Sequence, residues 1–256
     1  MKPEAPHPFA GELSVPNKYY SKIKELENRP DKVIRKEHVI VDTEENRKQT
    51  IERYNKSRKL FAELRDEYRL PIVPFEYVIA GSPKDAFIYT VAEKIVGENM
   101  AKMENIPPEV MVQMDAIYTK LAQYWLDKYR SGGDYLFDIH NLQMIYGHEY
   151  GINSAQNIPF IIDLDPYFRE WKGWGDPDQS HVLDLQVFGC LATTVTEIEK
   201  LEVRSNPKTI LTTARKLLHE ALAEVIEKMP KDNEFYKEVL HAYQRSMLSS
   251  AAGGKV

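Results

Sequence analysis

The sequence changes character near Gly97, and this change constrains the fold more than any other feature of the chain. Before it, short apolar runs separated by turn residues predict strands, and one long stretch with apolar residues at helical spacing predicts a helix. The expected elements are a hairpin of strands 19–27 and 32–41, a helix over 44–68, and strands 72–80 and 86–96. The first part is therefore predicted to be a small β-rich domain with one long helix.

After Gly97 the pattern becomes mostly helical. A helix is expected over 108–130, starting after Pro107, and three more are expected over 181–202, 207–229 and 233–247. Between them, the apolar runs 142–147 and 158–166 predict a second hairpin. We therefore expect an α+β fold. Its expected divisions are a proline-rich extended arm (1–18), a β-rich domain (19–96), a helical domain (97–247) and a flexible tail (248–256).

Composition narrows the classes of function. The formal net charge is −5, and the two signs are interspersed, which argues against a nucleic-acid surface. The sequence holds no apolar run of the roughly 18–20 residues that a membrane span needs, and its N-terminus lacks the pattern of a secretory signal. Cys190 is its only cysteine, within an apolar helical stretch, so we expect a buried, inert thiol and a cytoplasmic location.

Carboxylates gather in two stretches of the second half. The run F-I-I-D-L-D-P (160–166) ends an apolar strand with Asp163 and Asp165, which point the same way in extended backbone. Two oxygen ligands on one side suit Mg²⁺, although two solvated acids at a strand end would look the same in sequence. In Y-L-F-D-I-H-N-L-Q-M-I-Y-G (135–147), Asp138 stands five residues before Gln143.

These two stretches, in this order, resemble the protein-kinase-like superfamily, which includes aminoglycoside and choline kinases. In that family an Asp base, four residues, a metal-binding amide and a strand are followed by a second metal-binding Asp. Further similarities precede them in the family's order. They are V-I-R-K (33–36), like the strand with the phosphate-binding lysine; the helix 44–68; V-A-E-K-I-V-G (91–97), like the adenine-binding hinge; and the helix 108–130.

The resemblance implies a two-lobed fold with ATP and Mg²⁺ as cofactors, and it assigns roles residue by residue. Asp138 would orient the acceptor hydroxyl. The metal ligands would be Gln143, Asp163 and Asp165. The nucleotide-binding residues would be Arg35 or Lys36 for the phosphates, Glu52 or Glu63 as the pairing acid, and the backbone of Glu93 and Ile95 for the adenine. The acceptor is a small molecule or a protein.

The sequence departs from the family at several points. No glycine-rich loop precedes Lys36, Leu136 and Phe137 stand where His and Arg are usual, and Asp165 replaces the glycine after the metal-binding Asp. A pseudokinase that binds a nucleotide or partner without catalysis is therefore an alternative. A haloacid-dehalogenase-type phosphatase, suggested by the D-x-D of 163–165, is a second one. The charged residues 197, 199, 200 and 202 are predicted to form a solvated helix face.

Overall fold

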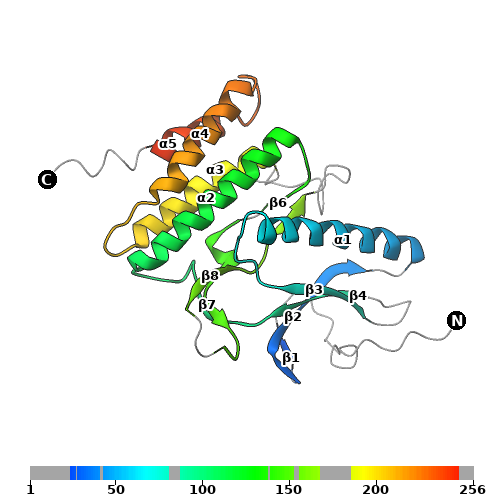
Figure 1. Cartoon of the computed structure of the whole chain (residues 1–256). Helices are drawn as coiled ribbons and strands as arrows, with labels where there is room; N and C mark the ends of the chain where they lie inside the picture. The colour runs from blue at the N-terminus through cyan, green and yellow to red at the C-terminus, as the bar shows by residue number, and fades with distance from the viewer. Residues whose placement is uncertain are drawn as a thin grey trace. The chain divides into compact units, whose positions relative to one another are not determined.

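The computed structural model describes residues 24–26, 28–40, 43–80, 87–137, 139–152, 156–167 and 186–247. Within these ranges the protein is mixed α and β, with small sheets, one long helix before residue 100 and four helices after it (Figure 1). The expected α+β class is confirmed. The proposed arm (1–18) and tail (248–256) lie outside the described residues.

The expected helices are present, most of them shorter than predicted. They are α1 (Glu44–Asp66), α2 (Pro108–Ser131), α3 (Val187–Arg204), α4 (Thr212–Lys228) and α5 (Tyr236–Met247). The prediction that α4 starts at residue 207 was wrong by five residues. Asp115 of α2 accepts the N–H groups of Thr213 and Ala214 at 3.3 and 2.8 Å, so the cap of α4 comes from a distant element. No described helix is long and apolar enough to cross a membrane.

The described strands form three small sheets. Their bounds are β1 (Lys24–Leu26), β2 (Arg29–Ile40), β3 (Phe75–Ala80), β4 (Phe87–Glu93), β5 (Ile95–Asn99), β6 (Tyr135–Phe137), β7 (Met144–Glu149), β8 (Ile158–Ile161) and β9 (Asp165–Tyr167). The sheet orders are β1-β2-β4-β3, β5-β7-β8 and β6-β9. The strand expected over 86–96 is two strands of different sheets, because the N–H of Lys94 leaves the ladder and donates to the Asp31 carbonyl at 2.8 Å.

The chain divides into two compact units whose boundary cuts through α1, β5 and β7. The first unit contains residues 1–59, 73–96 and 147–156, and the second contains 60–72, 97–146 and 157–256. The units interleave in sequence, whereas the sequence predicted a single boundary near residue 96.

In the first unit, the N-terminal part of α1 packs on the four-stranded sheet. Tyr54 stacks edge-on against Tyr77 of β3 with ring centroids 4.1 Å apart, and the hydroxyls of Ser57 and Tyr77 lie 3.2 Å apart. Antiparallel pairing places Tyr77 opposite Thr90, and Thr90 opposite Arg35. Residues opposite one another share a face of a sheet, so Arg35 belongs to the face that α1 covers.

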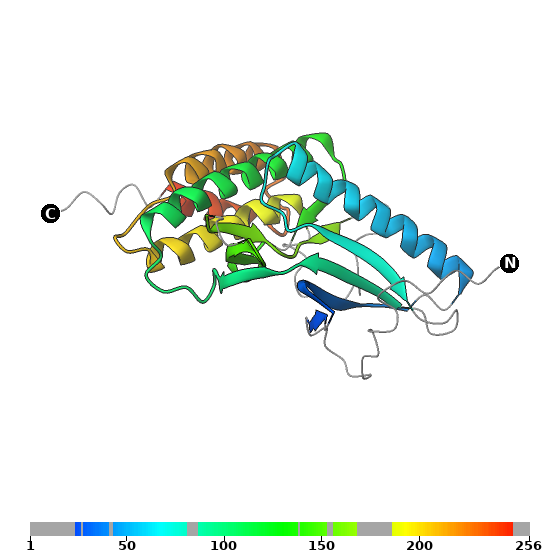
Figure 2. The ribbon, with the colours of Figure 1, turned by 60° about the horizontal axis from the view of Figure 1, so that its bottom comes forward.

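The second unit is built around α2. This helix packs against α3 and α4 (Figures 1 and 2). It presents an almost unbroken apolar face, and its Trp125 is fully buried. The indole N–H of Trp125 donates to the Leu136 carbonyl at 2.9 Å, and the N–H of Leu136 donates to the Tyr124 hydroxyl at 2.9 Å. These two bonds hold β6 against α2 and so position the loop that follows β6.

Candidate functional site

The loop between β6 and β7 carries the residues that resemble a catalytic loop. It ends in a short 3-10 turn, Asn141–Gln143, and Asp138 within it lies outside the described residues. Phe137, the chain neighbour of Asp138, pairs with Asp165 in the antiparallel β6–β9 ladder. The short strand pair was not predicted from the sequence, and it brings the backbone of the two acidic stretches together.

A second backbone contact joins the same stretches at the other end of the loop. The N–H of Ile162 donates to the carbonyl of Gln143 at 2.9 Å, so Gln143 lies beside the residue that precedes Asp163. Gln143 and Asp163 are each partly exposed. Of the four residues assigned to the acceptor and the metal, the described backbone therefore places Gln143, Asp163 and Asp165 in one region of the second unit.

The side chain of Asn141, which is only 2% exposed, holds the loop against the helices. The hydroxyl of Tyr118 on α2 donates to its Oδ1 at 2.8 Å, and its Nδ2 donates to the Glu197 carbonyl on α3 at 3.0 Å. Burial raises the pKa of Tyr118 well above its usual value, so this phenol stays a hydrogen-bond donor at any physiological pH. The loop is thus fixed to two helices through one side chain.

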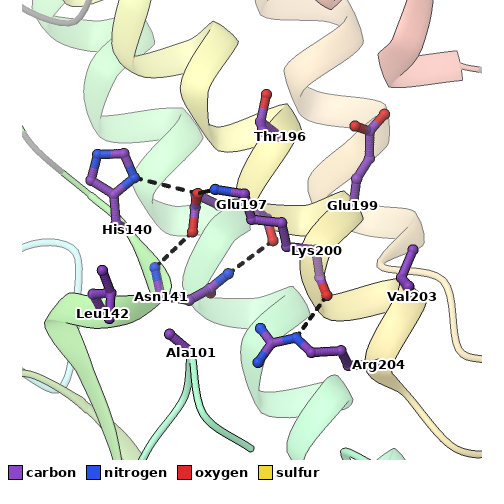
Figure 3. A pocket seen from close by; sticks show the side chains of 10 residues that line it. All are labelled: Ala101, His140, Asn141, Leu142, Thr196, Glu197, Glu199, Lys200, Val203 and Arg204. Atoms are coloured by element: carbon purple, nitrogen blue, oxygen red, sulfur yellow. Dashed lines mark hydrogen bonds and ion pairs between the residues drawn. The ribbon is translucent and has the colours of Figure 1, made fainter. Parts of the chain in front are cut away.

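Glu197 is the second anchor and the centre of a charged cluster (Figure 3). Its carboxylate accepts the backbone N–H of Asn141 at 2.8 Å, lies 3.3 Å from Nδ1 of His140, and lies 2.5 Å from Nζ of Lys200. Burial opposes ionisation of this 2%-exposed side chain, but the bonds from His140, Asn141 and Lys200 outweigh that cost and lower the pKa of Glu197 to about 2. The carboxylate is therefore ionised whenever the protein is folded near neutral pH.

A third set of contacts holds the loop from the segment that follows β5. The side-chain amide of Asn99 donates to the Leu142 carbonyl at 2.7 Å, and the N–H of Met100 donates to the Met144 carbonyl at 2.9 Å. Arg204 of α3 in turn donates to the carbonyls of Met100 and Met103 at 2.8 and 3.1 Å. Residues 140–144 are consequently held from three directions, as expected of a loop that must keep a fixed geometry.

A surface pocket of about 550 Å³ opens beside this loop. Its described lining residues are Ala101, His140, Asn141, Leu142, Thr196, Glu197, Glu199, Lys200, Val203 and Arg204 (Figure 3). All of them belong to the second unit. The pocket therefore shares its loop wall with the candidate catalytic loop.

The residues next to the Ile162–Gln143 contact carry oxygen groups of the kind that Mg²⁺ prefers. Mg²⁺ is bound in proteins through one or two carboxylates, with water and substrate phosphates completing its octahedron. Asp163 carries a carboxylate on a half-exposed side chain, and Gln143 carries an amide oxygen, Oε1, that is buried. Both are hard oxygen donors. Among the residues that the structure describes, no group of three His, Cys, Asp or Glu side chains could hold a metal ion; the carboxylates of Asp138 and Asp165 lie outside that description.

The residues assigned to the nucleotide belong to the first unit, except Glu63. Arg35 lies on the α1 side of the sheet, and the backbone of Lys36 pairs with Tyr89. Glu52 is exposed on α1, whereas Glu63 receives a hydrogen bond from Lys128 at 2.7 Å. Neither glutamate has a described bond to Arg35.

In the hinge-like segment (91–97), some of the hydrogen-bonding groups already have partners within the protein. The N–H of Glu93 donates to the Pro74 carbonyl at 3.0 Å, and its side chain forms an ion pair with Lys32. Ile95 begins β5. The expectation that the Glu93 backbone meets an adenine therefore cannot rely on its N–H group in this conformation.

The prediction of a solvated helix face at residues 197–202 was wrong for two of its members. Glu197 and Glu202 are buried, at 2% and 4% exposure, and each is held by hydrogen bonds. The helical spacing of the sequence could have indicated this burial. Glu197 lies on the same face of α3 as three other buried residues, Cys190, Thr194 and Leu201. Cys190 itself is buried, as expected.

The described residues offer no support for the haloacid-dehalogenase-type phosphatase alternative. That fold needs parallel strands alternating with helices after its acidic motif. In the described residues after β9, 186–247, three helices follow one another with only an isolated bridge at Ser205. The sequence matches no protein-family model and no curated protein, so the function is argued from this geometry and from the resemblance of the motifs.

Proposed function

We propose that the protein is an ATP- and Mg²⁺-dependent phosphotransferase of the protein-kinase-like type, acting on a hydroxyl acceptor. The observation that carries the proposal is the bond from the Ile162 N–H to the Gln143 carbonyl. It joins the two stretches of sequence that the resemblance assigns to one site. The pairing of Phe137 with Asp165 supports the same meeting of the two stretches.

The order of elements around that contact also favours this function. Helix α2 is followed by the short strand β6, the loop, and then β7 and β8, which belong to one sheet. Strand β9 comes next and pairs with β6. The part from α2 through the loop, β7 and β8 to Asp163 follows the order that the resemblance implies, whereas the pairing of β6 with β9 was not expected. A two-lobed kinase-like architecture is part of the proposal.

In the proposed reaction the chain's own residues bind and orient. Asp138 accepts a hydrogen bond from the acceptor hydroxyl and takes its proton as the oxygen attacks the terminal phosphorus of ATP. The bond from that phosphorus to the bridging oxygen breaks, and ADP leaves. Gln143 and Asp163, with Asp165 beside them, would hold Mg²⁺, which when bound neutralises charge on the phosphates.

The first unit would supply the nucleotide contacts. One of Arg35 and Lys36 would contact the phosphates, with Glu52 or Glu63 as its pairing acid, and the backbone at Glu93 and Ile95 would meet the adenine. The alternative, a nucleotide-binding module without catalysis, is favoured by one observation. Glu63 is already paired with Lys128, which removes one of the two candidate acids.

Paramagnetic broadening tests the metal site directly. Mn²⁺ replaces Mg²⁺ in oxygen-ligand sites and broadens the NMR signals of nearby nuclei. With ATP present, we expect substoichiometric Mn²⁺ to broaden the amide signals of Gln143 and Asp163. Broadening should be lost in Asp163→Asn and kept in Glu109→Gln, a matched loss of one carboxylate on the exposed side of α2.

Two results of that experiment would count against the proposal. Broadening confined to other parts of the chain would place the metal elsewhere. Equal broadening in wild type and Asp163→Asn would show that Asp163 is not a ligand. If ATP and Mn²⁺ bind but no acceptor hydroxyl is phosphorylated in a broad substrate panel, the binding-module alternative replaces the enzyme.

A further inference from the structure

The pocket beside the loop has an uneven distribution of charge. Two of its lining residues are acidic, Glu197 and Glu199, and both are already paired. Glu197 is held by Lys200 and His140, and Glu199 forms an ion pair with Arg245, which also donates to the Thr196 hydroxyl at 3.2 Å. Two permanent cations, Lys200 and Arg204, therefore line the pocket together with two carboxylates, and Arg245, outside the lining, pairs with one of those carboxylates.

The cations retain hydrogen-bonding capacity. Lys200 has a side chain that is 58% exposed, and its one described contact, with Glu197, uses one of three ammonium protons. Within the described chain, Arg204 donates through Nε and Nη1 to backbone carbonyls, and no described bond uses Nη2. Figure 3 shows both side chains extending from α3 on the side of the pocket that faces the loop.

The remaining wall is apolar and exposed. Leu142 is 60% exposed and Val203 is 79% exposed, and both line the pocket together with Ala101. A volume of about 550 Å³ lies within the range of small-molecule sites, roughly 300–1,000 Å³. A small ligand with an apolar or sugar-like body and a negatively charged group would match this wall and these cations.

We propose that this pocket binds the acceptor substrate, and that the acceptor is a small hydroxylated organic anion. The role as acceptor rests on the proposed phosphotransferase function, because the pocket includes His140, Asn141 and Leu142 from the loop that carries Asp138. The preference for anions stands on the pocket itself. A ligand held there would lie next to the loop, with its charged group at Lys200 and Arg204.

Binding without nucleotide tests the pocket separately from catalysis. The probes are small fragments of matched size in three classes: hydroxy carboxylates, neutral polyols and hydroxy amines. Amide shifts of residues 140–142 and 196–204 in ¹H–¹⁵N spectra report binding at the pocket. We expect hydroxy carboxylates to shift these signals at lower concentration than the other two classes.

A charge placed on the rim tests the electrostatic part. Val203→Glu adds a negative charge at an exposed position, and Val203→Lys is the matched control with a positive charge. We expect Val203→Glu to weaken carboxylate binding roughly threefold to tenfold, and Val203→Lys to preserve or strengthen it. The difference should shrink at high salt.

The possible outcomes separate the two proposals. If no fragment shifts the pocket signals, if amines bind best, or if the two Val203 variants behave alike, the anion pocket is wrong. If carboxylates bind as expected but Mn²⁺ and ATP do not broaden Gln143 and Asp163, the pocket stands as an anion site and its role as acceptor site falls with the phosphotransferase.

Discussion

Glu197 receives three donors on a carboxylate that is almost completely buried. Its position under the loop means that one side chain connects α3 to Asn141 and His140 at once. A buried carboxylate with good hydrogen bonds contributes little net stability compared with an apolar residue, but removing its charge leaves the donors unpaired. Glu197 is therefore a positioning residue whose loss should be felt at the loop.

Replacing Glu197 with Gln should destabilise the protein. The amide keeps the volume but removes the charge that pairs with Lys200 and His140, so the free energy of unfolding should fall by about 3 kcal/mol. Urea unfolding at pH 7 measures the change. Glu199→Gln, on the same helix and paired with Arg245 at a more exposed site, should cost less than about 1 kcal/mol. Equal losses for the two variants would contradict the anchoring role.

The lowered pKa of Glu197 predicts a specific acid sensitivity. A carboxyl whose pKa is about 2 when folded and 4.5 when unfolded contributes stability that is fully present above pH 4.5. That contribution, at most about 3 kcal/mol, is lost as the pH falls from 4.5 towards 2. Chemical unfolding between pH 5 and pH 3 should therefore show a steeper loss for wild type than for Glu197→Gln. Parallel pH profiles would show that the native carboxylate is not held in its charged form.

At the scale of elements, a buried ion pair joins the last three helices. Arg215 of α4 contacts Glu202 of α3 through two bonds of 2.6 and 2.8 Å, and its Nη1 donates to the Arg245 carbonyl of α5 at 3.0 Å. Glu202 also accepts the N–H of Leu211 at 2.9 Å. The pair thus fixes the register of three helices whose apolar faces alone would allow sliding.

Single and double replacements of this pair should be strongly non-additive. Arg215→Met and Glu202→Met each leave an uncompensated buried charge, so each should lower the free energy of unfolding by about 3–5 kcal/mol. The double variant leaves neither charge, so its loss should be clearly smaller than the sum of the two. Urea unfolding of the four proteins completes the cycle. Additive losses would mean that the two side chains act independently.

Elements were predictable from the sequence where periodicity was strong. The apolar face of α2 runs from Val110 to Leu126 and predicted the helix. Its ends were predicted from Pro107 and from Gly132, which adopts the left-handed conformation that ends the helix. The pair β6–β9 was not predicted, because three-residue strands carry too little pattern for alternation to be seen. The start of α4 was misplaced because its cap comes from Asp115, about one hundred residues away in sequence.

The sequence proposes the functional residues of the candidate site, but it did not predict the side chains that hold the loop. Asp163, Gln143 and Asp138 were found from spacing and from a family resemblance. Their supports, Asn141 and Glu197, are polar residues whose burial depends on tertiary contacts with α2 and α3, and local sequence shows such contacts only weakly. The sequence predicts Glu197 at the surface because acidic side chains are rarely buried without a partner, and its partners are spread over three segments.

At the scale of the whole molecule, the residues proposed for phosphoryl transfer belong to both units. The second unit holds the proposed metal and acceptor groups, and the first holds the proposed nucleotide groups. A nucleotide that binds only the folded state should raise the stability of the protein by mass action. At one hundred times its dissociation constant, the gain is about 2.7 kcal/mol.

Thermal unfolding with ATP, with and without Mg²⁺, tests the central claim most directly. For a chain of 256 residues, saturating ATP and Mg²⁺ should raise Tm by roughly 5 °C or more, in wild type and in Glu109→Ala. ATP alone should give a smaller shift, and Asp163→Ala should lose the part that depends on Mg²⁺. No shift at millimolar ATP and Mg²⁺, or an equal shift in Asp163→Ala, would contradict the proposed metal–nucleotide site.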